Sequence, residues 1–142
     1  MLWEGEEYTL QLDSHMRFVE GWDELLIEEL ANCPSEKPIL SCSPAQYTPP
    51  NNLEKRPKAM VRRVMPFIKN GNIRGCGELL DRRPPIPLNG AFIAAGFVFS
   101  KSELLQEVPY DPYYYFDQEE ITYALRAYTH GWDVFSPHRQ YL

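Results

Sequence analysis

The sequence has 142 residues, of which 44% are hydrophobic and 24% charged, and its formal net charge at pH 7 is −6. This length predicts one domain over residues 1–142. The negative net charge, with only short basic groups, argues against a nucleic-acid partner. No apolar run approaches the roughly 18 residues of a membrane span, so we expect no membrane partner. Three widely spaced cysteines without a CxxC pair indicate reduced thiols in the cytoplasm.

The first half of the chain alternates between predicted strands and a helix. Apolar and polar residues alternate over 8–12, which predicts a half-buried strand. Apolar residues then recur at helical spacing over about 20–32, and KPILSCSP at 37–44 predicts a short buried strand. Residues 44–66 hold Pro-Pro, Asn-Asn and a basic cluster, which predict a long loop.

The second half contains further strands and one long helix. In chain order we predict a hairpin over 67–80 that turns at Asn70-Gly71, a connection over 81–90, a strand over 91–100, a helix over about 118–129 and a strand over 132–137. The strand over 91–100 is apolar on both faces and is therefore predicted to be central. Gly131 is placed to cap the helix. Interleaved strands and helices favour an α/β sheet covered by helices.

Asp13 and His15 are the first candidate site. They lie two residues apart at the end of a predicted strand, so an extended chain directs both side chains to the same side. A carboxylate and an imidazole suit a divalent ion such as Mn²⁺, and the open coordination positions could take a pyrophosphate. A polar strand end that starts a turn has the same pattern, and on these residues alone it is the commoner explanation.

The acidic stretch FDQEE is the second candidate site. Asp117, Glu119 and Glu120 fall at the start of the predicted helix, where negative charge is favourable. Asp117 and Glu120 have the spacing of a capping box, which is the better explanation for those two. A cap leaves Glu119 without a role, and a carboxylate beside a sugar can stabilise an oxocarbenium charge or hold a hydroxyl.

Two further stretches suggest ligand contact. Gly96 lies in AFIAAGFVFS next to two alanines, which indicates close approach of a ligand or a backbone, although tight helix-on-sheet packing explains it equally well. Tyr113, Tyr114 and Tyr115 in VPYDPYYYF offer flat apolar faces and hydroxyls that suit sugar rings, although at least half of the aromatics in this stretch must simply pack.

Three segments, YTLQLDSHMRFVEGWD, AAGFVFS and VPYDPYYYFDQEEITYALRAYTHGWDVFSP, together resemble one glycosyltransferase family. This is the family of UDP-GlcNAc:hydroxyproline polypeptide N-acetylglucosaminyltransferases and their bacterial relatives. The resemblance covers most of the chain, and residues 40–90 match only loosely. It implies a GT-A-type fold with a mixed central sheet flanked by helices, Mn²⁺ or Mg²⁺ as cofactor, a UDP-sugar donor, and a hydroxyl acceptor such as protein hydroxyproline.

The resemblance also implies roles for individual residues. The DSH variant of the DxD motif, which is Asp13, Ser14 and His15, would hold the donor diphosphate, with Asp13 and His15 as metal ligands. The donor-sugar pocket would be lined by Ala94, Ala95 and Gly96, while Arg126 would pair with an acid or reach toward phosphate. The carboxylates that face the sugar or acceptor would be Asp117, Glu119 and Glu120, with Glu119 as the preferred catalytic group.

The sequence departs from the family pattern at both ends. Family members carry a uridine-gripping α/β half before the DxD strand, and this chain begins almost at the motif, so we expect open sheet edges and a possible homo-oligomer. His138 is a low-ranking third metal ligand and is expected to be a surface residue, whereas Trp132 and Asp133 are expected to be structural. The alternative to a transferase is a non-catalytic remnant that binds a sugar or a protein.

Overall fold

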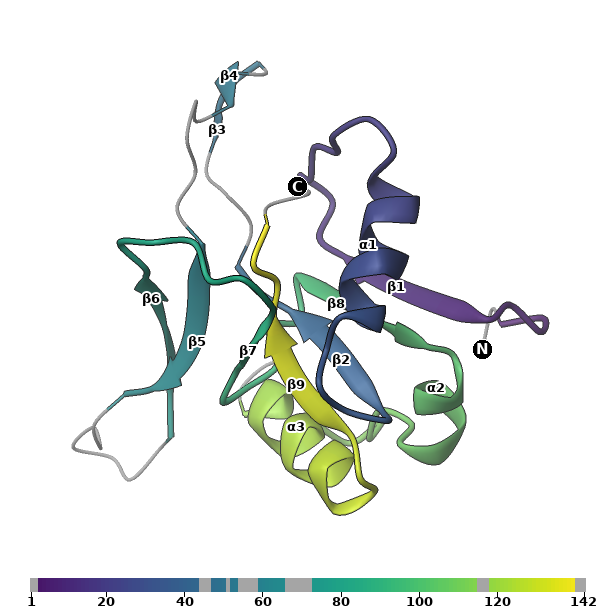
Figure 1. The fold of residues 1–142 in the computed structure, drawn as a ribbon. Coiled ribbons are helices and arrows are strands. Elements are labelled where there is room, and N and C mark those ends of the chain that lie inside the picture. Colours follow the sequence, from purple (N-terminus) through teal and green to yellow (C-terminus); the bar gives the residue numbers. More distant parts are fainter. Residues whose placement is uncertain are drawn as a thin grey trace.

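The computed structural model describes residues 3–43, 47–50, 52–53, 59–65, 73–114 and 118–139. Its main feature is a five-stranded mixed sheet in the order β1-β8-β2-β9-β7 (Figure 1). The strands are β1 (Tyr8–Leu12), β8 (Phe97–Lys101), β2 (Pro38–Ser41), β9 (Asp133–Ser136) and β7 (Leu88–Asn89). Strands β2 and β9 run parallel, and the other neighbouring pairs are antiparallel.

Helices cover both faces of this sheet. They are α1 (Trp22–Ala31), α2 (Glu103–Glu107) and α3 (Glu119–Thr129). Because successive strand residues point to opposite faces, Leu40 and Phe135 pack with Leu26 of α1, whereas Ile39 and Val134 pack with α2 and α3. This arrangement confirms the predicted α/β class with a mixed sheet flanked by helices. Within the described residues, no helix is long and apolar enough to cross a membrane.

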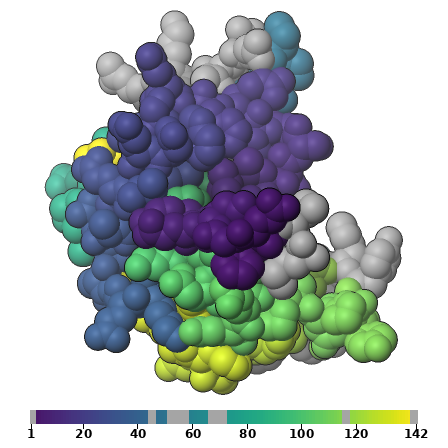
Figure 2. All heavy atoms as spheres, turned by 90° about the vertical axis from the view of Figure 1, so that its right-hand side faces the viewer, coloured from purple at the N-terminus to yellow at the C-terminus, as the bar shows by residue number. Residues whose placement is uncertain are grey.

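Strand β1 forms one edge of the sheet. Among the described strands it pairs with β8 alone, and Figure 2 shows the N-terminal segment crossing this side of the molecule between the segments of α1 and α2. Its apolar residues Tyr8, Leu10 and Leu12 pack toward α1. Gln11 therefore faces the other side of the sheet, where its amide nitrogen donates to the Ala95 carbonyl at 2.8 Å. The predicted strand is confirmed.

Two small hairpins lie outside the main sheet. They are β3 (Tyr47–Thr48) with β4 (Asn52–Leu53), and β5 (Met60–Val64) with β6 (Gly75–Leu79). The loop predicted over 44–66 is therefore wrong over β5, because that strand gains its ladder from a distant partner that no local pattern reveals. The second arm of the predicted hairpin corresponds to β6, whereas its first arm and the predicted turn at Asn70-Gly71 lie outside the described residues.

Arg62 connects the β5–β6 hairpin to the main sheet. Its backbone N–H donates to Ser136 Oγ at 3.2 Å, and its carbonyl accepts from the Ala91 N–H at 2.8 Å. The neighbouring Val61 is 2% exposed, so this part of the hairpin is anchored by burial as well. These contacts fix the place from which the Arg62 side chain extends.

The strand predicted over 91–100 is correct only in its second half. Strand β8 begins at Phe97 and lies between β1 and β2, as expected for a central strand. Gly96 therefore precedes the strand rather than interrupting it. Helix α2 and the short strand β7 were not predicted, because each is too short to show a periodic pattern of its own.

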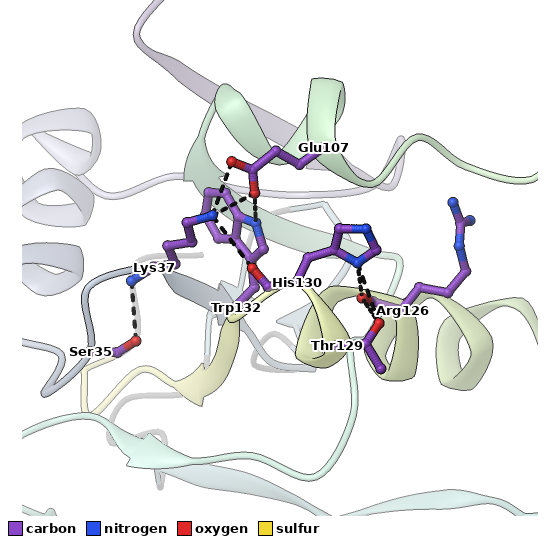
Figure 3. Close-up of polar contacts among 7 residues, drawn as sticks. All are labelled: Ser35, Lys37, Glu107, Arg126, Thr129, His130 and Trp132. Atoms are coloured by element: carbon purple, nitrogen blue, oxygen red, sulfur yellow. Dashed lines mark hydrogen bonds and ion pairs between the residues drawn. The ribbon is translucent and has the colours of Figure 1, made fainter.

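The end of α3 is joined to the sheet by a polar cluster. The predicted cap at Gly131 is confirmed, since this glycine has φ of 82° and the next residue, Trp132, donates its N–H to Ala127 O at 3.0 Å. Lys37 Nζ contacts both Glu107 oxygens at 3.0 and 2.7 Å, and Trp132 Nε1 donates to Glu107 Oε2 at 2.8 Å (Figure 3). Trp132 is 2% exposed, which agrees with its expected structural role.

Replacing Glu107 by glutamine should lower the thermal unfolding temperature at neutral pH, by an amount that shrinks in acid. The hydrogen bond from Lys37 holds the pKa of Glu107 below its usual value of 4.5. The stabilisation is therefore present above pH 4.5 and is lost as the pH falls through the lower pKa of the folded state. Thermal unfolding measured across this acidic range tests the expectation. The exposed Glu103→Gln on α2 is the control, and a pH-independent difference would contradict it.

His138 is buried, which corrects the expectation of a surface histidine. Its side chain is 7% exposed, and Glu29 of α1 is 1% exposed. Glu29 Oε1 lies 2.6 Å from the backbone nitrogen of His138 and 2.7 Å from its Nδ1. The sequence showed Glu29 only as one of two acids on the outer side of α1, so this long-range partner could not be seen there.

Candidate functional site

Asp13 and His15 come together immediately after β1. The Asp13 N–H donates to Gly96 O at 3.1 Å, which extends the β1–β8 ladder to the first residue of the pair. Asp13 Oδ2 then lies 3.8 Å from His15 Nε2 across a turn that contains Ser14. The two side chains are 58% and 68% exposed, respectively, so solvent and small ligands reach both. The two side chains therefore lie together as predicted, but a turn brings them together rather than the extended chain that the i, i+2 argument assumed.

This pair provides a partial set of metal ligands. One carboxylate and one imidazole match the mixed O/N ligation of Mn²⁺, and their exposure leaves room for oxygen atoms of a ligand or water. No group of three or more His, Cys, Asp or Glu side chains that could hold a metal ion occurs in the described part of the chain. A cation here would therefore rely on ligands from outside these two residues for its remaining positions.

Gly96 provides space for the Asp13 carboxylate. A Cβ built on this glycine would lie 2.5 Å from Asp13 Oδ2 and 3.1 Å from Asp13 Cγ. Real Cβ atoms do not approach oxygen so closely, so any other residue would displace the carboxylate. The close approach expected at Gly96 therefore exists, and it comes from a candidate metal ligand.

Substituting Gly96 by alanine should displace Asp13 and weaken metal-dependent nucleotide binding. The added methyl group displaces the end of the Asp13 side chain, which is 58% exposed and free to move, so the variant should lose metal-dependent binding with little change in stability. Calorimetric titration of UDP in the presence of Mn²⁺ measures the effect. Gly5→Ala provides a control for the same exchange without a steric contact, because nothing lies within 4 Å of a Cβ at Gly5. The φ of 115° at Gly5 makes the backbone of this control more strained than that of the Gly96 variant. Unchanged UDP affinity in the Gly96 variant would contradict the expectation.

Glu120 is held by two groups on different elements. Its Oε1 accepts from the Ala95 N–H at 2.7 Å, and its Oε2 lies 3.5 Å from Arg62 Nη2. The capping-box interpretation is wrong for Glu120, because this carboxylate contacts Ala95 and Arg62 instead of the backbone at the start of the helix. The residue before α3, Gln118, has φ of 69° and makes no side-chain cap bond. Asp117, the other half of the proposed box, lies outside the described residues.

Glu119 differs from its neighbour in the chain. Its Oε2 is buried and has no hydrogen-bond partner within the described part of the structure. A buried carboxylate oxygen without a partner is costly, and such atoms are found where the protein stores strain, at catalytic sites, and where a water or an ion supplies the missing contact. Of the two described acids at the start of α3, Glu120 therefore binds Ala95 and Arg62, whereas Glu119 has one oxygen without a partner among the described residues.

These residues border a cleft of about 460 Å³ between the end of β1, the β5–β6 hairpin and the start of α3. We call it the first cleft, and its lining includes Asp13, Ala95, Gly96, Glu119 and Glu120. It also contains Arg62 and Arg74, which are two cations that can face an anionic ligand. The same hairpin supplies both arginines. Arg62 lies on β5, and Arg74 immediately precedes β6.

Sequence analysis missed the arginines of the first cleft. Arg62 belongs to a short basic group that could meet a phosphate, but a solvated loop was the favoured interpretation, and its side chain is only 14% exposed. Its Nη1 contacts Ser43 Oγ at 3.3 Å, and its buried Nε has no partner within the described residues. The signal available was a strand-like stretch, AMVRRV, inside a segment otherwise rich in loop-forming residues.

Arg126 does not line the first cleft. It lies two turns along α3 and borders a second cleft of about 360 Å³, together with Glu119 and three tyrosines. Asp133, the other residue expected to be structural, accepts a hydrogen bond from Ser35 Oγ at 2.7 Å. Of the described candidates, Asp13, Ala95, Gly96, Glu119 and Glu120 line the first cleft, and His15 lies beside it through its contact with Asp13. Ser14 and Ala94 are not among its lining residues, and Glu119 borders both clefts.

The fold and the site define an α/β protein that presents an acid–imidazole pair, a free carboxylate and two arginines around one cleft. This arrangement belongs to proteins that bind an anionic, polar ligand. A family model described as "Glycosyltransferase (GlcNAc)" matches residues 1–142, and the chain belongs to this family. The resemblance found in the sequence is therefore confirmed at the level of the family, which is one of transferases. Neither the curated proteins nor the solved structures contain a match.

Proposed function

We propose that this chain forms the metal and donor-sugar side of a GT-A-type transferase. It would move N-acetylglucosamine or a related sugar from a UDP-sugar to a hydroxyl acceptor, such as protein hydroxyproline. The observation that carries the proposal is the exposed Asp13–His15 pair at the border of a cleft that also holds Arg62, Arg74 and Glu119. Membership of the GlcNAc glycosyltransferase family supports the same sugar class.

The first cleft offers a separate partner for each part of a UDP-sugar. Asp13 and His15 would hold Mn²⁺ or Mg²⁺, which when bound offsets the negative charge of a diphosphate. Arg62 and Arg74 add fixed positive charge for the same phosphates. Ala95 and Gly96 leave room for a sugar beside Asp13 because neither has a bulky side chain.

Glu119 is the proposed catalytic carboxylate. Its carboxylate borders both clefts, so it can accept a hydrogen bond from a hydroxyl group, and its charge can stabilise positive charge that develops at an anomeric carbon. Glu120 positions the site by holding the Ala95 backbone and Arg62 near the cleft. The two neighbouring acids thus have different roles, which the sequence alone left open.

The alternative is a module that binds a sugar or protein without turnover. The described residues offer only two candidate metal ligands, Asp13 and His15. This favours the binding module, because a resident metal is usually held by more protein groups. Release of UDP from UDP-GlcNAc separates the two, because a transferase also passes its sugar to water at a low rate. We expect UDP release that requires Mn²⁺ and stops with a chelator. Metal-dependent UDP binding without release would indicate the binding module, and a folded sample without metal-dependent UDP binding would overturn the proposal.

A further inference from the structure

The second cleft lies on the other side of Glu119 from the Asp13–His15 pair. We call it the tyrosine cleft, and it is lined by Tyr110, Asp111, Tyr114, Glu119, Thr122, Tyr123 and Arg126. Its volume of about 360 Å³ is enough for one small ring compound but not for a whole nucleotide-sugar. Because Glu119 borders both clefts, a ligand in the tyrosine cleft would lie next to whatever occupies the first cleft.

Two stacked tyrosines provide a rigid wall for this cleft. The rings of Tyr110 and Tyr123 lie 4.0 Å apart with an angle of 13° between their planes. Tyr123 is 3% exposed and Tyr110 is 38% exposed, so the outer ring rests on an inner ring fixed by the core. Tyr114 is 48% exposed and adds a ring that a ligand can reach without any change of the core.

Tyr110 also connects the cleft to strand β1 and to the acids of α3. Burial raises the pKa of its hydroxyl, a hydrogen bond with the Gln11 side chain acts in the opposite direction, and the charges of Glu119 and Glu120 raise it further. Gln11 in turn donates to Ala95 O, beside the first cleft. The wall of the tyrosine cleft is therefore held at a fixed position relative to the candidate donor site.

The charges of the lining favour a neutral, hydroxylated ligand. Two carboxylates, Asp111 and Glu119, face one guanidinium, Arg126, so an anionic ligand is disfavoured. Hydroxyl groups can pair with all three of these groups and with the Thr122 hydroxyl. The flat apolar faces of tyrosine pack well against the C–H face of a saturated ring.

We propose that the tyrosine cleft binds the acceptor as a neutral saturated ring whose hydroxyl points toward the Glu119 carboxylate. This inference rests on the proposed function, because it assigns the acceptor side of the same reaction. The ring stacks on Tyr114, and its hydroxyl donates a hydrogen bond to the carboxylate of Glu119, which lines the cleft. A monosaccharide at the end of a glycan and a 4-hydroxyproline in a peptide share this chemistry.

Saturation-transfer NMR on the full chain, without donor or metal, tests the proposal. The probes are methyl glycosides of glucose, galactose and N-acetylglucosamine in one arm, and N-acetyl-4-hydroxyproline methylamide in the other. We expect one arm to give signals from the C–H protons of one ring face, and that arm identifies the source of the ring. Absence of signal in both arms would overturn the proposal.

Variants then locate the binding. Tyr114→Ala should weaken probe binding by about 2- to 10-fold, the loss expected for one aromatic contact. Thr122→Val removes a hydroxyl at nearly constant volume and should also weaken binding, which provides a second variant if the first is unstable. Tyr128→Ala is the matched control, because Tyr128 is 71% exposed on the same helix and does not line the cleft. Binding that is equal in wild type and in both cleft variants would contradict the assignment.

This test fails separately from the proposed function. The probe experiment contains no UDP-sugar, whereas the titration of UDP with Mn²⁺ contains no acceptor. Probe binding without metal-dependent UDP binding would keep a ring-binding cleft and reject the transferase. If both hold, Tyr114→Ala should raise the acceptor KM more than it lowers kcat, as a residue that binds the acceptor but takes no part in bond cleavage would do.

Discussion

Replacing Asp13 by alanine should reduce the affinity for UDP in the presence of Mn²⁺ by more than about 100-fold, because even residues that only support metal ligands cost about 10–100-fold when mutated. Asp13 is one of two described candidate ligands, and its carboxylate lies 3.8 Å from His15 Nε2. The loss should be confined to binding that depends on the metal. Calorimetric titration of UDP with Mn²⁺, and again with a chelator, measures it.

Asp23→Ala is the matched control for this variant. Asp23 is an exposed aspartate in the first turn of α1, so its removal changes the net charge equally without touching the first cleft. The fold should persist in the Asp13 variant, since the Asp13 side chain is mostly exposed and the ladder to Gly96 uses only its backbone. Equal UDP affinity in the wild type and the Asp13 variant would contradict the metal site. The acid–imidazole pair would then be only a polar strand end.

Replacing Glu119 by glutamine should lower kcat for sugar transfer by about 100-fold or more, within the range for a lost charged group in a reacting site. The amide keeps the size of the side chain but provides no negative charge for an anomeric centre. The N–H group that replaces one oxygen also cannot accept a hydrogen bond from a hydroxyl. Steady-state kinetics with saturating UDP-sugar and acceptor measures the change.

Two comparisons show whether the effect belongs to the free oxygen of Glu119. Glu24→Gln on the exposed side of α1 makes the same charge change away from both clefts and should leave kcat unaltered. Thermal unfolding of the Glu119 variant should match that of the wild type, because glutamine keeps the volume of the side chain and the described residues show no hydrogen bond to Oε2 that the exchange would remove. Wild-type kcat in the Glu119 variant would exclude this carboxylate from the reaction.

The sequence was sufficient wherever a local pattern determines the structure. Strand β1 shows alternation, α1 and α3 show helical spacing, and β9 is an apolar run next to a glycine cap, so all four were predicted close to their observed bounds. Strand β5 was missed because its strand-like residues lie within a segment rich in loop-forming residues, and because its stability comes from pairing with β6. Helix α2 and strand β7 are too short for any periodicity to be visible.

The candidate site shows the same limit. The i, i+2 spacing predicted that Asp13 and His15 lie together, but β1 ends at Leu12 and the two side chains meet across a turn rather than along an extended strand. The contact between Arg62 and Glu120 spans 58 positions of the chain and depends on where the β5–β6 hairpin docks. The sequence singled out Glu119 because a helix cap would occupy Glu120, and that reason is wrong, since Ala95 and Arg62 engage Glu120 instead.

The edge position of β1 has a consequence for the durability of the site. Asp13 is attached to a strand with a single described neighbour, whereas β8, β2 and β9 each have two. Strands held by one ladder open more readily than interior strands, and such opening does not require the core to melt. On warming, we therefore expect nucleotide affinity to decline before the cooperative unfolding transition, with backbone amides of β1 exchanging their hydrogens ahead of those in β2.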